Sequence, residues 1–110
     1  MTIKFENMDD TSYNVVGSSL KGSIFASFAE LEEIFGKPAF EGKGDKITTE
    51  WVVRWENDEE NAFGYFTLYD WRYGRDFNDD YSRIEWNIGG KSFDDWCAAD
   101  DIIKPRLEAA

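Results

Sequence analysis

Hydrophobic and polar residues alternate most clearly between Ile47 and Tyr73, where two aromatic-rich runs flank the polar tip 57–61. A period of two predicts β-strands, and a short polar segment between two such runs predicts a hairpin. The second run is partly apolar on both faces, which is typical of a central strand. We therefore predict a long hairpin in the middle of an antiparallel sheet. The first strand is expected to turn these residues toward the core: Ile47, Thr49, Trp51, Val53 and Trp55.

Helical spacing replaces the alternation before the hairpin. Ser27 and Glu30 have the spacing of a capping box, in which each side chain accepts a hydrogen bond from the other residue's backbone amide. Gly36 can adopt the positive φ of a residue that ends a helix, and Pro38 prevents its continuation. The spacing predicts a short helix from Phe28 to Phe35. Its expected apolar face consists of Phe28, Leu31, Ile34 and Phe35.

A second helix is predicted near the C-terminus. Ser92 and Asp95 again have capping spacing, and Asp94 adds a favourable charge at the helix N-terminus. Asp100 falls on the apolar stripe and Pro105 cannot sit in an undisturbed helix interior. We therefore expect this helix to run to about residue 99 and then to kink, or to restart as a single turn over 102–107.

The remaining segments predict shorter strands. Residues 2–6 alternate as a short edge strand, and residues 13–16 are expected to be extended. Residues 20–25 are expected to be extended as well, with Gly22 marking a bulge or a close approach of another chain segment. Residues 81–88 alternate as a further strand, which Gly89 and Gly90 are expected to terminate.

These elements predict one α+β domain over residues 1–110. Its sheet is expected to have about four or five mostly antiparallel strands, with the short capped helix and the C-terminal helix packed on one face. No apolar run reaches the roughly 20 residues of a membrane span, and the N-terminus lacks the apolar region of a secretory signal. The expected setting is the cytoplasm, without membrane contact.

Charge narrows the possible partners. The chain has 12 Lys and Arg against 23 Asp and Glu, a net charge of −11. Such an excess of acid repels nucleic acids and favours basic protein partners. Histidine is absent and Cys97 is the single cysteine, so the commonest general base, metal ligands and disulfides are missing. We expect a non-enzymatic binding protein without a cofactor; the sequence leaves its oligomeric state open.

Four short motifs occur in a fixed order: FGKP at 35–38, TEW at 49–51, LYDW at 68–71 and EWNIGG at 85–90. This arrangement resembles a loose group of short bacteriophage-encoded proteins, and the resemblance covers roughly residues 20–105. No activity is established for that group. The resemblance implies a small accessory protein of phage or prophage origin. Inhibitors of host defence, including anti-CRISPR proteins, are often similar in size and acidity, and by this analogy we expect an inhibitor.

Acidic clusters and an aromatic set are the candidate binding residues. Carboxylates at suitable spacing could imitate nucleic-acid phosphates and occupy a basic, nucleic-acid-facing groove on a host protein or nucleoprotein complex. An exposed aromatic rim could instead anchor a protein partner, and its candidate residues are Tyr65, Tyr69, Trp71, Tyr73, Phe77 and Tyr81. Solvated loops and an aromatic core would explain the same residues without a partner. The residues predicted to contact a partner are Asp58, Glu59, Glu60, Asp70, Asp76, Asp79, Asp80, Tyr69, Trp71 and Tyr73.

The sequence also offers two ligand-binding alternatives, a calcium loop and a nucleotide pocket. Asp76, Asn78 and Asp80 have the spacing that begins a calcium loop, but Tyr81 stands where that loop requires glycine. A protein that sequesters a small signalling nucleotide would need several basic residues in one pocket. The group available for such a pocket is Arg54, Arg72, Arg75 and Arg83.

Overall fold

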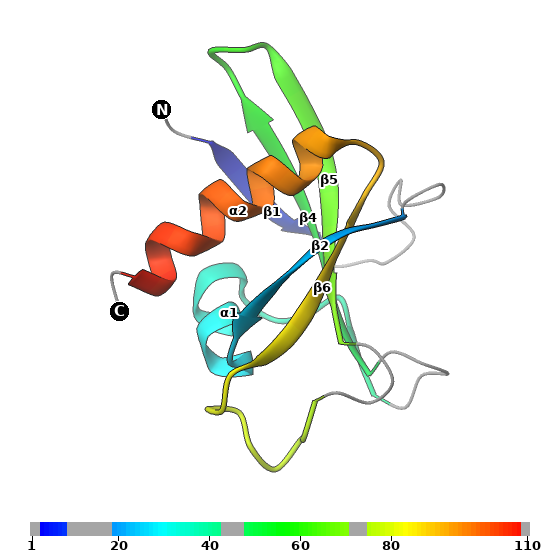
Figure 1. Ribbon diagram of the computed structural model, residues 1–110, viewed down its shortest axis with the longest axis vertical. Coiled ribbons are helices and arrows are strands. Elements are labelled where there is room, and N and C mark those ends of the chain that lie inside the picture. The colour runs from blue at the N-terminus through cyan, green and yellow to red at the C-terminus, as the bar shows by residue number, and fades with distance from the viewer. Residues whose placement is uncertain (1–2, 9–18, 43–47, 71–74, 109–110) are drawn as a thin grey trace.

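The computed structural model describes residues 3–8, 19–42, 48–70 and 75–108. These residues form an antiparallel sheet with strand order β1-β4-β5-β6-β2, and β3 pairs with β4 beside β1. Both helices lie on one face of this sheet (Figure 1). The predicted α+β architecture is therefore confirmed. The elements are β1 (Lys4–Met8), β2 (Ser19–Ala26), α1 (Phe28–Phe35), β3 (Phe40–Glu41), β4 (Thr49–Asn57), β5 (Ala62–Tyr69), β6 (Ile84–Gly90) and α2 (Phe93–Glu108).

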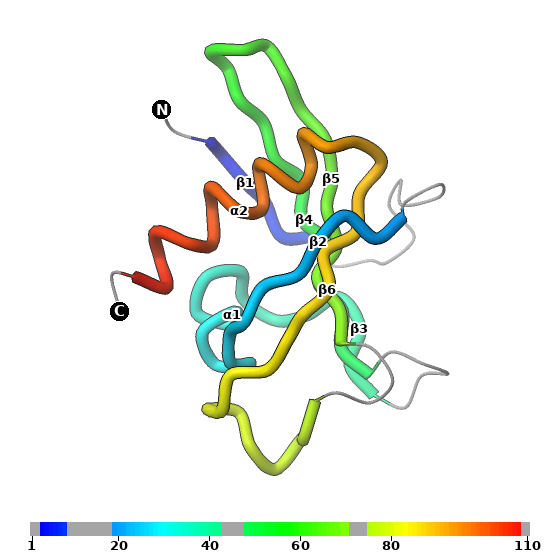
Figure 2. Tube along the Cα trace, viewed as in Figure 1, coloured from blue at the N-terminus to red at the C-terminus, as the bar shows by residue number. Residues whose placement is uncertain are grey.

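The predicted hairpin is the centre of the sheet. β4 and β5 pair over their whole length, from Glu50 opposite Tyr69 to Asn57 opposite Ala62. β1 and β3 extend the sheet beyond β4, and β6 and β2 extend it beyond β5 (Figure 2). Alternate residues of each central strand point into the helix-covered core, as period-two alternation requires. The fully buried side chains of these strands include Trp51, Val53, Phe66, Leu68, Trp86 and Ile88.

The first helix matches its prediction in both bounds and caps. Ser27 Oγ accepts from the Glu30 amide at 3.0 Å, and Glu30 Oε1 accepts from the Ser27 amide at 2.9 Å. Gly36 ends the helix with φ of 85°, and its N–H donates to the Glu32 carbonyl. Gly36 also accepts from Trp51 Nε1 at 2.8 Å, which joins the helix end to the central hairpin.

The last helix is longer than predicted. The kink expected near residue 99 is wrong, because α2 continues through Pro105 to Glu108. An interior proline removes one backbone donor and crowds the carbonyl four residues earlier, but burial of Ile102 and Ile103 on the sheet favours the helix. Arg106 Nη1 donates to the Ile102 carbonyl at 2.7 Å and so supplies a side-chain partner in this turn.

Two strand boundaries also differ from the sequence prediction. β6 begins at Ile84 and includes Gly89 and Gly90, which were expected to end it. The glycines remain in the sheet because β2 and β5 both pair with them. The bulge predicted near Gly22 is confirmed as a register shift, and a Cβ there would lie 2.7 Å from the Trp96 ring. The extended piece expected at 13–16 lies outside the described residues.

Candidate binding surface

The acidic hairpin tip is presented to solvent. Asp58, Glu59 and Glu60 are all exposed between β4 and β5. The turn is closed by the Glu59 amide, which donates to Asn57 Oδ1 at 3.1 Å, and by Asn61 with φ of 51°. Asp58 pairs with exposed Lys4 at 3.1 Å. Such an exposed ion pair stabilises the fold little, so the tip acids remain accessible to a partner.

A groove opens between this tip and α2, with a volume of about 230 Å³. Glu60 reaches it from the tip, and Asp94 and Asp101 reach it from the helix. No lysine or arginine among the described residues lines it. We call this feature the tip groove. The described residues that line it are Ile3, Trp55, Asn57, Glu60, Asp94, Cys97, Ala98 and Asp101.

Buried Asp95 fixes the helix against the hairpin and so forms the groove. Its Oδ1 accepts from Trp55 Nε1 at 2.8 Å, and its Oδ2 accepts from the amides of Lys91 and Ser92 at 2.9 and 3.2 Å. A Cβ at Gly64 would overlap Asp95 Oδ1. The glycine therefore permits the close approach of α2 to β5.

The thiol of Cys97 reports the charge around the tip groove. Its pKa is raised, first by burial and then by the nearby carboxylates of Asp101, Asp94 and Asp100. All of these effects disfavour a second negative charge. Three carboxylates and no described lysine or arginine line the groove, so it favours a cation.

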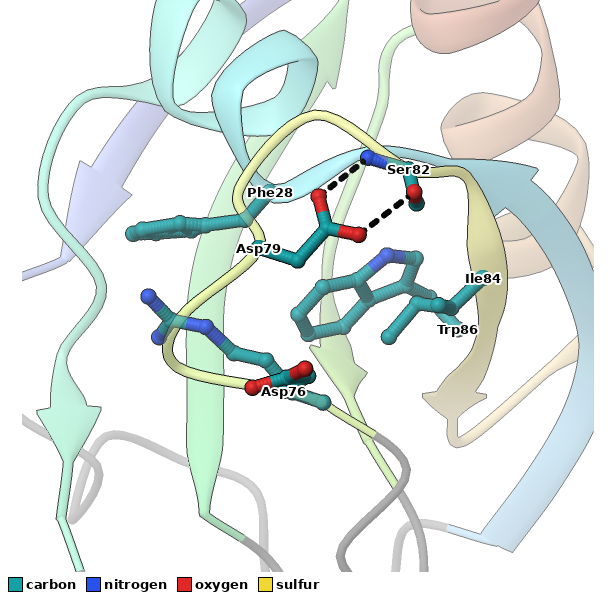
Figure 3. Close-up of a pocket in the computed structure, with 7 residues that line it drawn as sticks. Phe28, Asp76, Asp79, Ser82, Ile84 and Trp86 are labelled. Atoms are coloured by element: carbon teal, nitrogen blue, oxygen red, sulfur yellow. Dashed lines mark hydrogen bonds between the residues drawn. The ribbon is translucent and has the colours of Figure 1, made fainter.

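A second acidic region lies on the loop before β6. Asp76, Asp79 and Asp80 belong to it, together with the exposed rings of Phe77 and Tyr81. A hollow of about 50 Å³ separates part of this loop from the core. In Figure 3 the Asp79 carboxylate points toward Ser82, beside Trp86.

Asp79 organises this loop internally. Its Oδ1 accepts from the amides of Tyr81 and Ser82 at 3.1 and 3.0 Å, and its Oδ2 accepts from Ser82 Oγ at 2.6 Å. These bonds, with the Ser82 hydroxyl contributing most, lower the pKa of Asp79. Asp79 therefore acts first as a turn residue, although its position remains exposed.

Arg75 anchors the same loop to the core. Its guanidinium carbon lies 3.5 Å from the Phe28 ring centroid and 4.2 Å from that of Phe77. Nη1 pairs with Glu41 at 2.6 Å, and Nη2 pairs with Asp80 at 3.3 Å. Asp80 is thus partly neutralised by a buried cation.

Asp70 is not a surface residue, which corrects the sequence-based assignment. It is fully buried, and Oδ1 accepts from the amides of Thr48 and Thr49 at 2.8 and 2.9 Å. Oδ2 accepts from Thr48 Oγ1 at 2.6 Å and from the Arg75 amide at 3.3 Å. Asp70 joins the hairpin base to the following loop and offers no carboxylate to a partner.

Tyr69 lies half-buried on the sheet face opposite the helices. Burial, and then the carboxylate of its cross-strand neighbour Glu50, raise its pKa. Trp71 and Tyr73 lie outside the described residues. In the rest of the predicted aromatic set, Tyr65 is half-buried like Tyr69, whereas Phe77 and Tyr81 are exposed.

Glu50 on this face provides a pH-dependent prediction. Burial raises its pKa above the ordinary value of 4.5, so Glu50 stabilises the fold when protonated, and this stability is lost as pH rises through the raised pKa. We expect Glu50→Gln to unfold at higher urea than the wild type at pH 7. The difference should shrink below pH 4.5, where both side chains are neutral. A variant less stable than the wild type at pH 7 would show that the carboxylate is favourably paired.

The two acidic regions do not form one face. The hairpin tip lies at one end of the long axis and residues 75–83 lie at the other (Figure 1). The sequence-based list joined them and omitted the helical half of the tip groove. The available signal was the helical spacing of Asp94, Cys97, Ala98 and Asp101, which places all four on one stripe of α2.

The arginines expected for nucleotide capture are separated. Arg54 pairs with Glu56 at 3.5 Å, Arg75 is buried against Glu41 and Asp80, and Arg83 pairs with Glu30 at 2.6 Å. Arg75 lines the hollow beneath the loop and Arg54 lines a different one on β1 and β4. Arg72 lies outside the described residues. The three described arginines thus serve local ion pairs.

None of the described helices is long and apolar enough to cross a membrane. Comparison of the chain with protein-family models, curated proteins and solved structures finds no match.

Proposed function

We propose that this chain is a non-enzymatic, acidic protein that binds a basic, nucleic-acid-facing surface of a host protein or nucleoprotein complex in the cytoplasm. The resemblance to short phage proteins supports, by analogy with anti-CRISPR proteins, a role of this binding in the inhibition of host defence. The tip groove is the observation that supports the proposal most strongly. There, carboxylates from two separate elements surround one hollow that no described cation lines.

Electrostatic arguments support this choice over nucleic-acid binding. A net charge of −11 opposes phosphate and steers the protein toward cationic surfaces. A groove that binds nucleic acid carries lysine and arginine along the phosphate track. Exposed carboxylates on the tip and on α2 have the charge that complements such a groove on the partner. When this protein occupies the partner's groove, nucleic acid is excluded from it.

The loop 75–83 supports a second candidate, a protein-binding module that uses aromatic anchors. Tyr81 is 84% exposed and Phe77 is 48% exposed. Aromatic side chains dominate the energetics of many interfaces. Binding through this loop would depend little on salt and would be lost in Tyr81→Ala. Binding through the tip acids would weaken as salt is raised and would survive Tyr81→Ala.

The test uses purified nucleic-acid-binding defence complexes and measures affinity as salt is raised. We expect affinity to fall with salt, and the triple variant Asp58→Asn, Glu59→Gln, Glu60→Gln to bind about tenfold more weakly at low salt. Glu32→Gln with Glu33→Gln, which removes two charges at exposed positions of α1, is the control and should change affinity less. Affinity that is unchanged by salt and by the tip variant would contradict the proposal.

A further inference from the structure

We propose that the tip groove receives an arginine side chain of the partner protein. This inference rests on the proposed function and specifies the chemistry of one contact within it. The volume of about 230 Å³ is below the roughly 300–1,000 Å³ of small-molecule pockets. A single long side chain suits that size better than a free metabolite.

The lining of the groove matches the two parts of an arginine. Half-buried Ile3 and Cys97, with the small exposed edges of Trp55 and Ala98, form the apolar part of the lining. The aliphatic stem of an arginine can pack there while its charged head stays near water. Glu60 comes from the hairpin tip, and Asp94 and Asp101 come from α2. The guanidinium has five N–H donors in a planar fork, so it can address acceptors on both sides of a groove.

The acids of the groove remain available for that contact. Lys4 pairs with Asp58, and Lys104 pairs with Asp100. None of these four residues lines the groove. The three groove carboxylates appear in no ion pair among the described residues. Burial raises the pKa of the nearby Cys97 thiol most, and Asp101 and Asp94 raise it further. A partner cation would relieve this mutual repulsion.

The experiment titrates the full ¹⁵N-labelled chain with the capped peptide Gly-Arg-Gly and follows backbone and indole N–H signals. We expect shifts of the Cys97 and Ala98 amides and of the Trp55 indole. The citrulline peptide has nearly the same shape without the charge, and it should bind about tenfold more weakly. The lysine peptide should also bind more weakly than the arginine peptide, because an ammonium lacks the planar fork.

Two variants keep the test independent of folding defects. Asp101→Asn and Asp94→Asn should each weaken peptide binding, with Asp101 in the helix interior and Asp94 near the helix N-terminus. Glu33→Gln, on α1, should leave peptide binding unchanged. Thermal melts of all three would confirm that the variants remain folded.

The outcomes separate this inference from the proposed function. Shifts centred on residues 75–83, or equal binding of the citrulline or lysine peptide, would overturn the arginine site. A whole basic partner could also bind with salt-sensitive affinity that Asp94→Asn and Asp101→Asn leave unchanged. That result would overturn the arginine site, while the proposed function would stand. Partner binding without any salt dependence would contradict the proposed function itself.

Discussion

Asp70→Ala is expected to lower the free energy of unfolding by about 3–5 kcal/mol, as expected when one partner of a buried charged network is removed. The carboxylate is fully buried and accepts from two amides, one hydroxyl and the Arg75 amide, at 2.6 to 3.3 Å. Alanine would leave these donors without their acceptor. Each buried donor that loses its partner costs about 1–3 kcal/mol. Partial relaxation of the structure makes the total loss smaller than the added costs of the individual donors.

Urea denaturation followed by tryptophan fluorescence measures this loss. Asp70→Asn retains one acceptor oxygen and should fall between the wild type and Asp70→Ala. Glu33→Ala on the exposed face of α1 is the control and should stay within about 0.5 kcal/mol of the wild type. A loss below about 1 kcal/mol for Asp70→Ala would mean that water replaces the carboxylate and that the hairpin base is less tightly packed than described.

The central hairpin and the first helix could be predicted because their signals are local. Trp51, Val53 and Trp55 fall at every second position, and that period places them on one face of a strand. Ser27 and Glu30 lie three residues apart, so their capping bonds form within a single helical turn. No distant residue is needed to recognise either pattern.

The role of Asp70 could not be predicted, because its partners are distant in sequence. Its side chain bonds Thr48 and Thr49, more than 20 residues earlier. In the sequence it looks like one more acid beside a tryptophan. The continuation of α2 through Pro105 was also hidden, since burial of Ile102 and Ile103 against the sheet outweighs a single missing donor.

The tip groove illustrates the same limit at the candidate site. The sequence identified the tip acids and recognised the charge of the last helix. It could not place them together, because their proximity depends on how α2 docks against the hairpin. That docking depends on Asp95, which the sequence assigned only to capping, and on Gly64 and Gly90, whose missing side chains make room for it.

Asp95→Ala is therefore expected to lower the free energy of unfolding by about 3 kcal/mol and to loosen the helix start in particular. The carboxylate is 4% exposed and links Trp55 with the amides of Lys91 and Ser92. Alanine removes the acceptor for all three donors. It also leaves empty space beside Gly90, because alanine removes the Asp95 Oδ2 and Cγ atoms, which would lie 3.1 and 3.3 Å from a Cβ added at Gly90.

Hydrogen exchange gives this prediction a local readout. The amides of Lys91 and Ser92 should be protected in the wild type and exchange faster in Asp95→Ala, while the α1 amide of Leu31 should follow only global unfolding. Asp94→Ala is the matched control: it removes a neighbouring charge that touches no core donor, and should cost at most about 1 kcal/mol through the helix dipole. Asp95→Asn should be intermediate, because one amide oxygen cannot accept from both sides and its NH₂ group faces donors. If Asp95→Ala matched Asp94→Ala, the helix would be held by its apolar face alone, and the tip groove would not depend on this carboxylate.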